Sequence, residues 1–120
     1  MQDLSIDISE QKTRFRPGET IQGTLRWNIP DNPESVEISL FWRTEGKGTQ
    51  DVEVIDTAKH ESPGQLGQKD FNFKIPPEPY SFSGKLISII WAIEATAYPD
   101  EQTTRQQITI SPTGQEVVLE

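Results

Sequence analysis

Cysteine is absent from the 120 residues, and His60 is the only histidine. Disulfide frameworks, iron–sulfur clusters and ordinary zinc sites need several Cys or His ligands, so the sequence excludes them. Long apolar runs are absent too. The longest nearly apolar stretch, Leu86 to Ile93, is far shorter than the roughly 20 residues that a membrane-spanning helix needs. We therefore expect no metal, no cofactor and no membrane insertion.

Positive charge is scarce, because 11 Lys and Arg face 19 Asp and Glu and leave a net charge of −8. A chain of this sign repels phosphate backbones, so nucleic-acid binding is not predicted. The start, MQDLSIDISE, lacks the basic residues and apolar run of a secretory signal, and a cytoplasmic protein is expected. The length predicts one domain over residues 1–120, with 112–120 as a short strand or a loose tail.

Apolar and polar residues alternate in short segments that are separated by Pro, Gly, Asn and Asp, which is typical of half-buried strands. Such segments lie at 4–9, 21–27, 36–43, 52–54, 71–75, 86–98 and 103–111, and residues 57–67 read as a polar loop. The segment 86–98 also fits a helical stripe, but its Ile, Trp, Thr and Tyr content favours a strand. Seven strands predict an all-β, antiparallel two-sheet sandwich.

Two glycines have predicted roles. In Arg16-Pro17-Gly18-Glu19, proline presets φ at the second turn position and Gly18 supplies a positive φ at the third. Gly23 lies in the inward row of its strand, which predicts a bulge or a close approach of another backbone.

Three segments together resemble the arrestin N-terminal domain family. The first, Phe15–Gly23, has an aromatic residue, a PGE turn and a glycine at the family's spacing. The second is the alternating strand Val36–Trp42. The third and most specific is Phe71–Ala95, where an aromatic-rich strand, prolines, a P-x-S-x-x-G turn and a long strand with the central aromatic Trp91 follow one another.

This resemblance implies an immunoglobulin-like β-sandwich that binds or scaffolds other proteins and is not an enzyme. Members of the family sort membrane cargo, attach to receptors or control development in bacteria. Arrestins typically pair two such sandwiches, whereas 120 residues suffice for one. Whether another chain supplies a second sandwich is left open.

Basic residues alternate in one segment of this acidic chain. In an extended backbone, Lys12, Arg14 and Arg16 would share one face beside Phe15. Such a stripe predicts a site for an acidic or phosphorylated partner segment. The alternative is a solvated loop that has no partner.

Aromatic residues form a second set of candidates. Phe41 lies on the polar face of its strand, and Tyr80 and Phe82 flank the proline turn, so all three are expected to be exposed contact residues. The three tryptophans follow the aliphatic faces of their strands, which predicts core packing, with a sugar-stacking platform as the alternative. These tryptophans are Trp27, Trp42 and Trp91.

No catalytic residue is predicted. His60 lies in the expected polar loop without a scaffold to orient it, and the neighbouring carboxylates Asp51 and Glu53 have no apolar pocket to raise a pKa. The leading hypothesis is a non-catalytic module that docks a peptide or protein on a sheet face or an edge strand. A carbohydrate- or small-ligand-binding module is the alternative. Because a lone sandwich leaves open edges, a homodimer through edge strands is also expected.

Overall fold

The structure is a computed structural model that describes residues 3–46, 50–84, 86–113 and 117–118, with the side chains of 3, 82, 117 and 118 left undescribed. Its described part contains seven strands of six or more residues, three strands of two residues and one 3₁₀ turn. The elements are β1 (Asp3–Ile8), η1 (Ser9–Gln11), β2 (Arg14–Phe15), β3 (Thr20–Asn28), β4 (Ser35–Gly46), β5 (Val52–Glu61), β6 (Leu66–Lys74), β7 (Phe82–Ser83), β8 (Ile87–Tyr98), β9 (Gln102–Ile110) and β10 (Val117–Val118).

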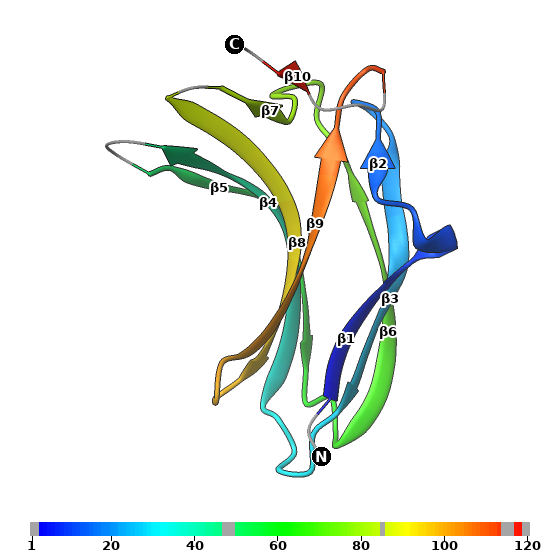
Figure 1. The fold of residues 1–120 in the computed structure, drawn as a ribbon. Coiled ribbons are helices and arrows are strands. Elements are labelled where there is room, and N and C mark those ends of the chain that lie inside the picture. The colour runs from blue at the N-terminus through cyan, green and yellow to red at the C-terminus, as the bar shows by residue number, and fades with distance from the viewer. Residues whose placement is uncertain (1–2, 47–49, 85, 114–116, 119–120) are drawn as a thin grey trace.

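Two sheets face each other across an apolar interior (Figure 1). The first sheet has the antiparallel order β1-β3-β6. The second has the antiparallel order β5-β4-β8-β9, to which β2 adds beside β9 and β7 beside β8. Among the described residues, parallel pairing is confined to the two-residue strands, β2 on β9 and β10 on β7. The predicted all-β two-sheet sandwich is confirmed.

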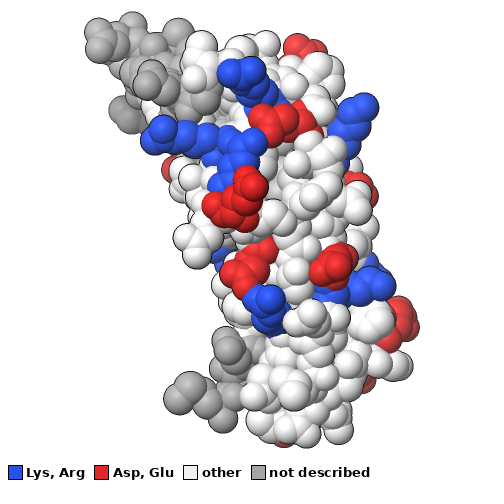
Figure 2. All heavy atoms as spheres, turned by 90° about the vertical axis from the view of Figure 1, so that its right-hand side faces the viewer, with Lys and Arg blue, Asp and Glu red and all other residues white. Residues whose placement is uncertain are grey.

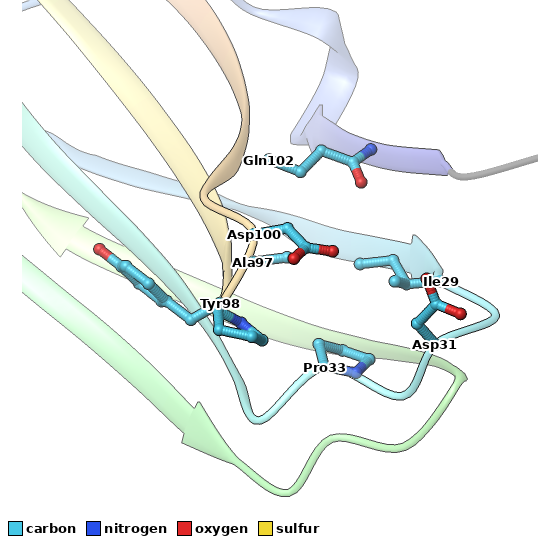
Figure 3. A pocket seen from close by; sticks show the side chains of 8 residues that line it. Ile29, Asp31, Pro33, Ala97, Tyr98, Asp100 and Gln102 are labelled. Carbon is cyan, nitrogen blue, oxygen red and sulfur yellow. The ribbon is translucent and has the colours of Figure 1, made fainter.

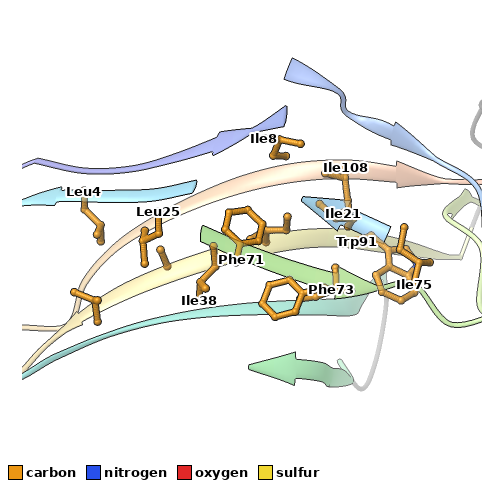
Figure 4. Close-up of a cluster of buried hydrophobic side chains, with 14 of the residues drawn as sticks. Leu4, Ile8, Ile21, Leu25, Ile38, Phe71, Phe73, Ile75, Trp91 and Ile108 are labelled. Carbon is orange, nitrogen blue, oxygen red and sulfur yellow. The ribbon is translucent and has the colours of Figure 1, made fainter. Parts of the chain in front are cut away.

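The core forms because each long strand directs alternate side chains inward. In β3, Ile21, Leu25 and Trp27 are buried while every second residue faces outward. Figure 4 shows side chains from both sheets meeting between the layers, among them Leu25 and Phe71 from the first sheet and Ile38 and Trp91 from the second. The predicted interior is therefore correct, and Trp42 packs against it as a half-buried side chain.

The segment that fits both a helix and a strand is a strand. β8 runs from Ile87 to Tyr98 and pairs with β4 along its whole length, which makes it a central strand of the second sheet. Trp91, Ile93 and Ala95 are fully buried on its inner face. Stiff or bulky side chains fit this pleated surface better than a helical turn.

The predicted polar loop over residues 57–67 is wrong. β5 continues to Glu61 and β6 already begins at Leu66. β5 lies at the edge of the sheet and pairs only with β4 in the described chain, so most of its side chains are exposed and give no alternating signal. His60 is consequently a strand residue and not a loop residue, and its ring centroid lies 5.9 Å from that of Trp27 in the opposite sheet.

The first sheet and the second sheet together contain all the long elements that the structure describes. None of the described elements is a helix of the length and apolarity that crossing a bilayer requires.

Candidate functional site

The basic segment, which carries Lys12, Arg14 and Arg16, crosses from the first sheet to the second. β1 ends at Ile8, and the chain turns through η1, where Glu10 and Gln11 have φ values of 62° and 54°. These left-handed conformations are costly for residues other than glycine, and they redirect the chain toward β9. There, the N–H groups of Thr109 and Ser111 donate to the carbonyls of Thr13 and Phe15 at 2.8 and 3.0 Å, which fixes β2 at the sheet edge.

The three predicted basic residues do not behave alike. Arg14 and Arg16 are exposed on either side of the buried Phe15, and neither belongs to an ion pair within the described residues. Lys12 is half-buried, forms an ion pair with Glu19, and holds its Nζ 4.9 Å from the centroid of the Phe15 ring. Two arginines, rather than three equivalent cations, are thus available to an anionic partner.

The Pro17-Gly18 turn brings Glu19 back to the basic segment. Gly18 has φ 85°, as predicted, and the N–H of Glu19 donates to the carbonyl of Arg16 at 3.1 Å. The carboxylate of Glu19 in turn accepts the N–H of Arg16 at 2.8 Å. The pKa of Glu19 is lowered, first by the hydrogen bond from Lys12 and then by that backbone N–H.

Removing the Glu19 charge should have a small, pH-dependent effect on stability. A lowered pKa contributes stability above the ordinary value of 4.5, and this contribution is lost as the pH falls through the lowered pKa. We expect Glu19→Gln to lower the free energy of unfolding by about 0.5 kcal/mol at neutral pH, since the pair is partly exposed, and by nothing in strong acid. Urea unfolding across this range measures it. The exposed Glu78→Gln is the control, and a gap that persists in acid would contradict the assignment.

A groove of about 230 Å³ opens beside this segment. It is lined by Ile8, Ser9, Glu10, Lys12, Phe15, Thr20 and Gln22. The groove exists because β1 pairs with β3 only from Gly23 onward, whereas β6 pairs with β3 from Thr20. The start of β3 therefore lacks a β1 partner.

The orientation of β3 adds backbone groups to this groove. The carbonyl of Glu19 accepts from Ile75, and the N–H of Ile29 donates to Gln65, so these groups point toward β6. Peptide groups alternate in direction along a strand. The N–H and C=O groups of Thr20 and Gln22 accordingly point to the β1 side, where the groove lies.

Figure 2 shows this side of the molecule with Lys and Arg side chains near its upper end and acidic side chains interleaved. The sequence pattern located Lys12, Arg14 and Arg16 but not the other residues of the site, which are Glu19, Thr20 and Gln22. For Glu19 a signal was present in the PGE turn, because this glutamate follows the basic residues closely enough to fold back on them.

The expected exposure of Phe41 is wrong, because this residue is only 6% exposed. Phe41 lies between Val54 of β5 and Ala92 of β8 on the outer face of the second sheet. The guanidinium carbon of Arg105 lies 5.2 Å from the ring centroid, and Glu94 holds Arg105 through an ion pair of 2.6 Å. A neighbouring side chain therefore covers this aromatic residue, which removes it from the contact candidates.

Tyr80 and Phe82 are the two aromatic candidates near the proline turn. Tyr80 is 40% exposed, whereas the side chain of Phe82 lies outside the described residues. Between them, Ser81 is buried, donates its N–H to the Ile110 carbonyl at 2.8 Å, and accepts the Ile110 N–H on Oγ at 3.0 Å. The serine of the P-x-S-x-x-G turn thus anchors the turn to the end of β9.

The hollows elsewhere give little support to a sugar or small-molecule site. A shallow hollow of about 600 Å³ passes over Gly67 and reaches the edge of Trp27, but Trp27 is only 3% exposed. The cavity in Figure 3, between the loop after β3 and the β8–β9 turn, has a volume of about 20 Å³, which is room for about one water molecule. Its Tyr98 ring points away from the other labelled side chains, and the nearby Glu37 carboxylate raises the pKa of Tyr98.

The described residues also contain no group of three or more His, Asp or Glu side chains that are arranged to hold a metal ion. No arrangement of nucleophile, base and oxyanion donors converges around the groove, since its polar residues are Ser9, Glu10, Lys12, Thr20 and Gln22 without a histidine. What the groove offers is hydrogen-bonding groups, an apolar floor and adjacent cations, a combination suited to an extended peptide.

The sequence matches no protein-family model and no curated protein. In structure, the chain is similar to Spo0M, the sporulation control protein from Bacillus subtilis, with a TM-score of 0.62 and 18% identity over 92% of this chain and 49% of that one. The chain spans about half the length of Spo0M. This likeness supports an arrestin-like fold.

A second similar structure is a β-glucosidase from Listeria innocua in complex with gluconolactone, with a TM-score of 0.51 and 13% identity over 97% of this chain and 16% of that one. At such identities the likeness concerns the fold alone. One of the two proteins is described as a control protein and the other as an enzyme, so fold does not decide the function.

Proposed function

We propose that residues 1–120 form one cytoplasmic, non-catalytic interaction module that binds an acidic or phosphorylated extended segment of another protein. The segment lies in the groove at the start of β3, its backbone pairs with groups of Thr20 and Gln22 that point to the β1 side, and its negative side chains reach Arg14 and Arg16. The observation that carries this proposal is the exposure of two arginines, without ion-pair partners in the described chain, beside a groove of about 230 Å³.

Three features of the site support an acidic or phosphorylated extended segment as the ligand. Arg forms bidentate, charge-assisted hydrogen bonds to carboxylate and phosphate groups. An exposed strand edge supplies main-chain bonds to an extended peptide whatever its side chains. Lys12 is already neutralised by Glu19, so it shapes the groove without competing for the ligand's charge.

The test is the affinity of a fluorescently labelled peptide that alternates phosphoserine with valine, measured by anisotropy. We expect the double variant Arg14→Glu/Arg16→Glu to weaken binding at least tenfold, since two charge-assisted contacts of about 1.5 kcal/mol each become repulsive. Binding should also weaken as salt is added, because the arginines are exposed.

The matched control is Lys59→Glu/Lys69→Glu, which makes the same change in net charge at two exposed lysines of β5 and β6, away from β2. It should bind the peptide nearly as the unaltered protein does. Equal losses for the two double variants would mean that net charge alone attracts the peptide, and would refute the site. Equal affinity for the unphosphorylated peptide would remove the phosphate from the proposal.

A further inference from the structure

The opposite edge of the second sheet is open along β5. β5 pairs with β4 through residues 52–61, and within the described chain its other side pairs with no strand. The one register shift lies between Leu40 and Phe41 of β4, opposite Ile55. Residues 56–61 are therefore a regular strand segment, and a regular open edge is a template for pairing with another strand.

The direction of the free backbone groups follows from the end of β5. The N–H of Ser62 donates to the Glu34 carbonyl at 3.0 Å, so it points toward β4. By alternation, the N–H and C=O groups of His60, Ala58 and Asp56 also point toward β4. Those of Thr57 and Lys59 point outward from the sheet edge. The Thr57 N–H donates there to the Asp56 carboxylate at 2.9 Å, a local bond that pairing with a second strand would replace.

A second copy of this same edge fits it in one register. In antiparallel pairing about a two-fold axis, residues directly opposite must face the same side of the sheet. An axis at Ala58 places Thr57 opposite Lys59 of the other copy and Asp56 opposite His60 of the other copy. An axis at Asp56 or Lys59 would instead place like charges opposite each other. An axis at Thr57 or His60 leaves only three regular residues in the pairing, because the bulge or the strand end intervenes.

The Ala58 register also satisfies the backbone. Thr57 and Lys59 form hydrogen-bonded pairs with Lys59 and Thr57 of the other copy. Ala58 then forms a non-hydrogen-bonded pair with itself, in which Cα atoms approach to about 4.5 Å, a separation that suits a small side chain. Lys59 is the residue that would discourage pairing at this edge, but it already forms an ion pair of 3.5 Å with Glu61.

We propose that two copies of this chain associate through antiparallel pairing of β5 about a two-fold axis at Ala58. The pairing joins the two second sheets into one continuous sheet and buries the outward-pointing backbone groups of both edges. The basic groove lies at the β2 edge, on the other side of the same sheet. The dimer thus carries two copies of the groove, and the failure of either proposal leaves the other standing.

Because the chain has no cysteine, a single introduced thiol reports the register directly. We expect Ala58→Cys to give a disulfide-linked dimer on mild oxidation, since its Cα separation in the dimer lies within the range that a disulfide spans. Thr57→Cys is the matched control. In the proposed register the two copies of position 57 are offset by two residues, beyond about 7 Å, so this variant should form no disulfide-linked dimer. Equal cross-linking of the two variants, or none at Ala58, would overturn the register.

Sedimentation velocity of the unaltered chain tests the dimer without a cysteine. We expect a species of twice 13.6 kDa that grows with concentration and with added salt, which screens the repulsion between chains of charge −8 each. Thr57→Pro removes an outward N–H and leaves the backbone ladder to β4 in place, although it also removes the exposed hydrogen bond of 2.9 Å between Thr57 Oγ1 and Ser39 Oγ. It should abolish the dimer while tryptophan fluorescence stays unchanged.

The matched control for the proline is Thr103→Pro on β9. The N–H of Thr109 points away from β8 toward β2, so that of Thr103 also lies on an open edge. This variant should keep the dimer. A monomer at every concentration and salt, or a dimer lost in Thr103→Pro and kept in Thr57→Pro, would refute the proposal.

Discussion

Replacing Trp91 with alanine is expected to lower the free energy of unfolding by about 3–5 kcal/mol, the range for deleting a fully buried large aromatic side chain. Trp91 has no exposed surface and lies between Trp42 of β4 and Ile108 of β9 on the inner face of the second sheet. Its Nε1 also donates to the Pro79 carbonyl at 3.1 Å. Deleting the ring leaves a cavity and removes the indole donor to the Pro79 carbonyl.

Urea unfolding followed by circular dichroism measures this loss, and two further variants separate its causes. Trp91→Phe retains most of the buried surface and removes the Nε1–H donor, so we expect a loss well below that of Trp91→Ala but above about 1 kcal/mol. Leu86→Ala removes an apolar side chain that is 72% exposed, and should change stability by less than about 0.5 kcal/mol. Similar losses for Trp91→Ala and Leu86→Ala would contradict the central place of Trp91 in the core.

The hydrogen bond of Trp91 also connects the parts of the third segment that resembles the arrestin family. The indole of Trp91 holds the chain at Pro79. Ser81, two residues after Pro79, forms two hydrogen bonds with Ile110. The aromatic residue, the prolines and the serine thus form one structural unit, in which the connection between β6 and β7 is tied to the inner face of the sheet and to the end of β9.

Strands with one buried face were predictable from the sequence, because burial of alternate residues leaves a period of two. β3 and β8 are such strands, and both the inward row of β3 and the choice of strand over helix for β8 are confirmed. The sequence predicts only residues 52–54 of β5, because an edge strand with both faces largely exposed has no such period. Its second half is held by the β4 ladder, which is an interaction between residues distant in sequence.

The features of the candidate site that were missed also depend on contacts between distant or folded-back segments. The burial of Phe41 comes from Arg105, which is 64 positions later in the chain (105 − 41) and reaches the ring across β8. The pairing of Lys12 with Glu19 depends on the angle of the PGE turn. The groove itself arises where β1 stops pairing with β3, which no property of residues 20–22 announces.

Gly23→Ala is expected to lower the free energy of unfolding by about 3 kcal/mol, at the upper end of what overpacking costs. Gly23 pairs with Ile8 of β1 on one side and with Phe71 of β6 on the other. A Cβ atom here would lie 2.3 Å from the backbone carbonyl oxygen of Asp7 and 2.7 Å from Cζ of the Phe71 ring. The predicted close backbone approach is therefore the correct alternative, since the β1–β3 register contains no bulge.

Two comparisons distinguish this steric effect from ordinary loss of a glycine. Gly64→Ala changes a residue with φ 78° and no atom within 4 Å of the added Cβ, so strain alone should cost it about 1 kcal/mol. Gly23→Ala/Phe71→Leu relieves the ring contact but leaves the Asp7 carbonyl in place, so it should not recover the loss. Recovery in the double variant would mean that the ring, and not the β1 backbone, sets the limit.

The same clash should be visible at the groove. The atom nearest to a Cβ at position 23 is the carbonyl oxygen of Asp7 near the end of β1. Ile8, Ser9 and Glu10, which follow Asp7, line the groove beside Lys12. Gly23→Ala should therefore weaken phosphopeptide binding severalfold even under conditions where the variant stays folded, and should speed amide exchange in β1 more than in β6. Gly64→Ala should leave both unchanged. Unaltered peptide affinity in a folded Gly23→Ala variant would show that the groove does not depend on where β1 parts from β3.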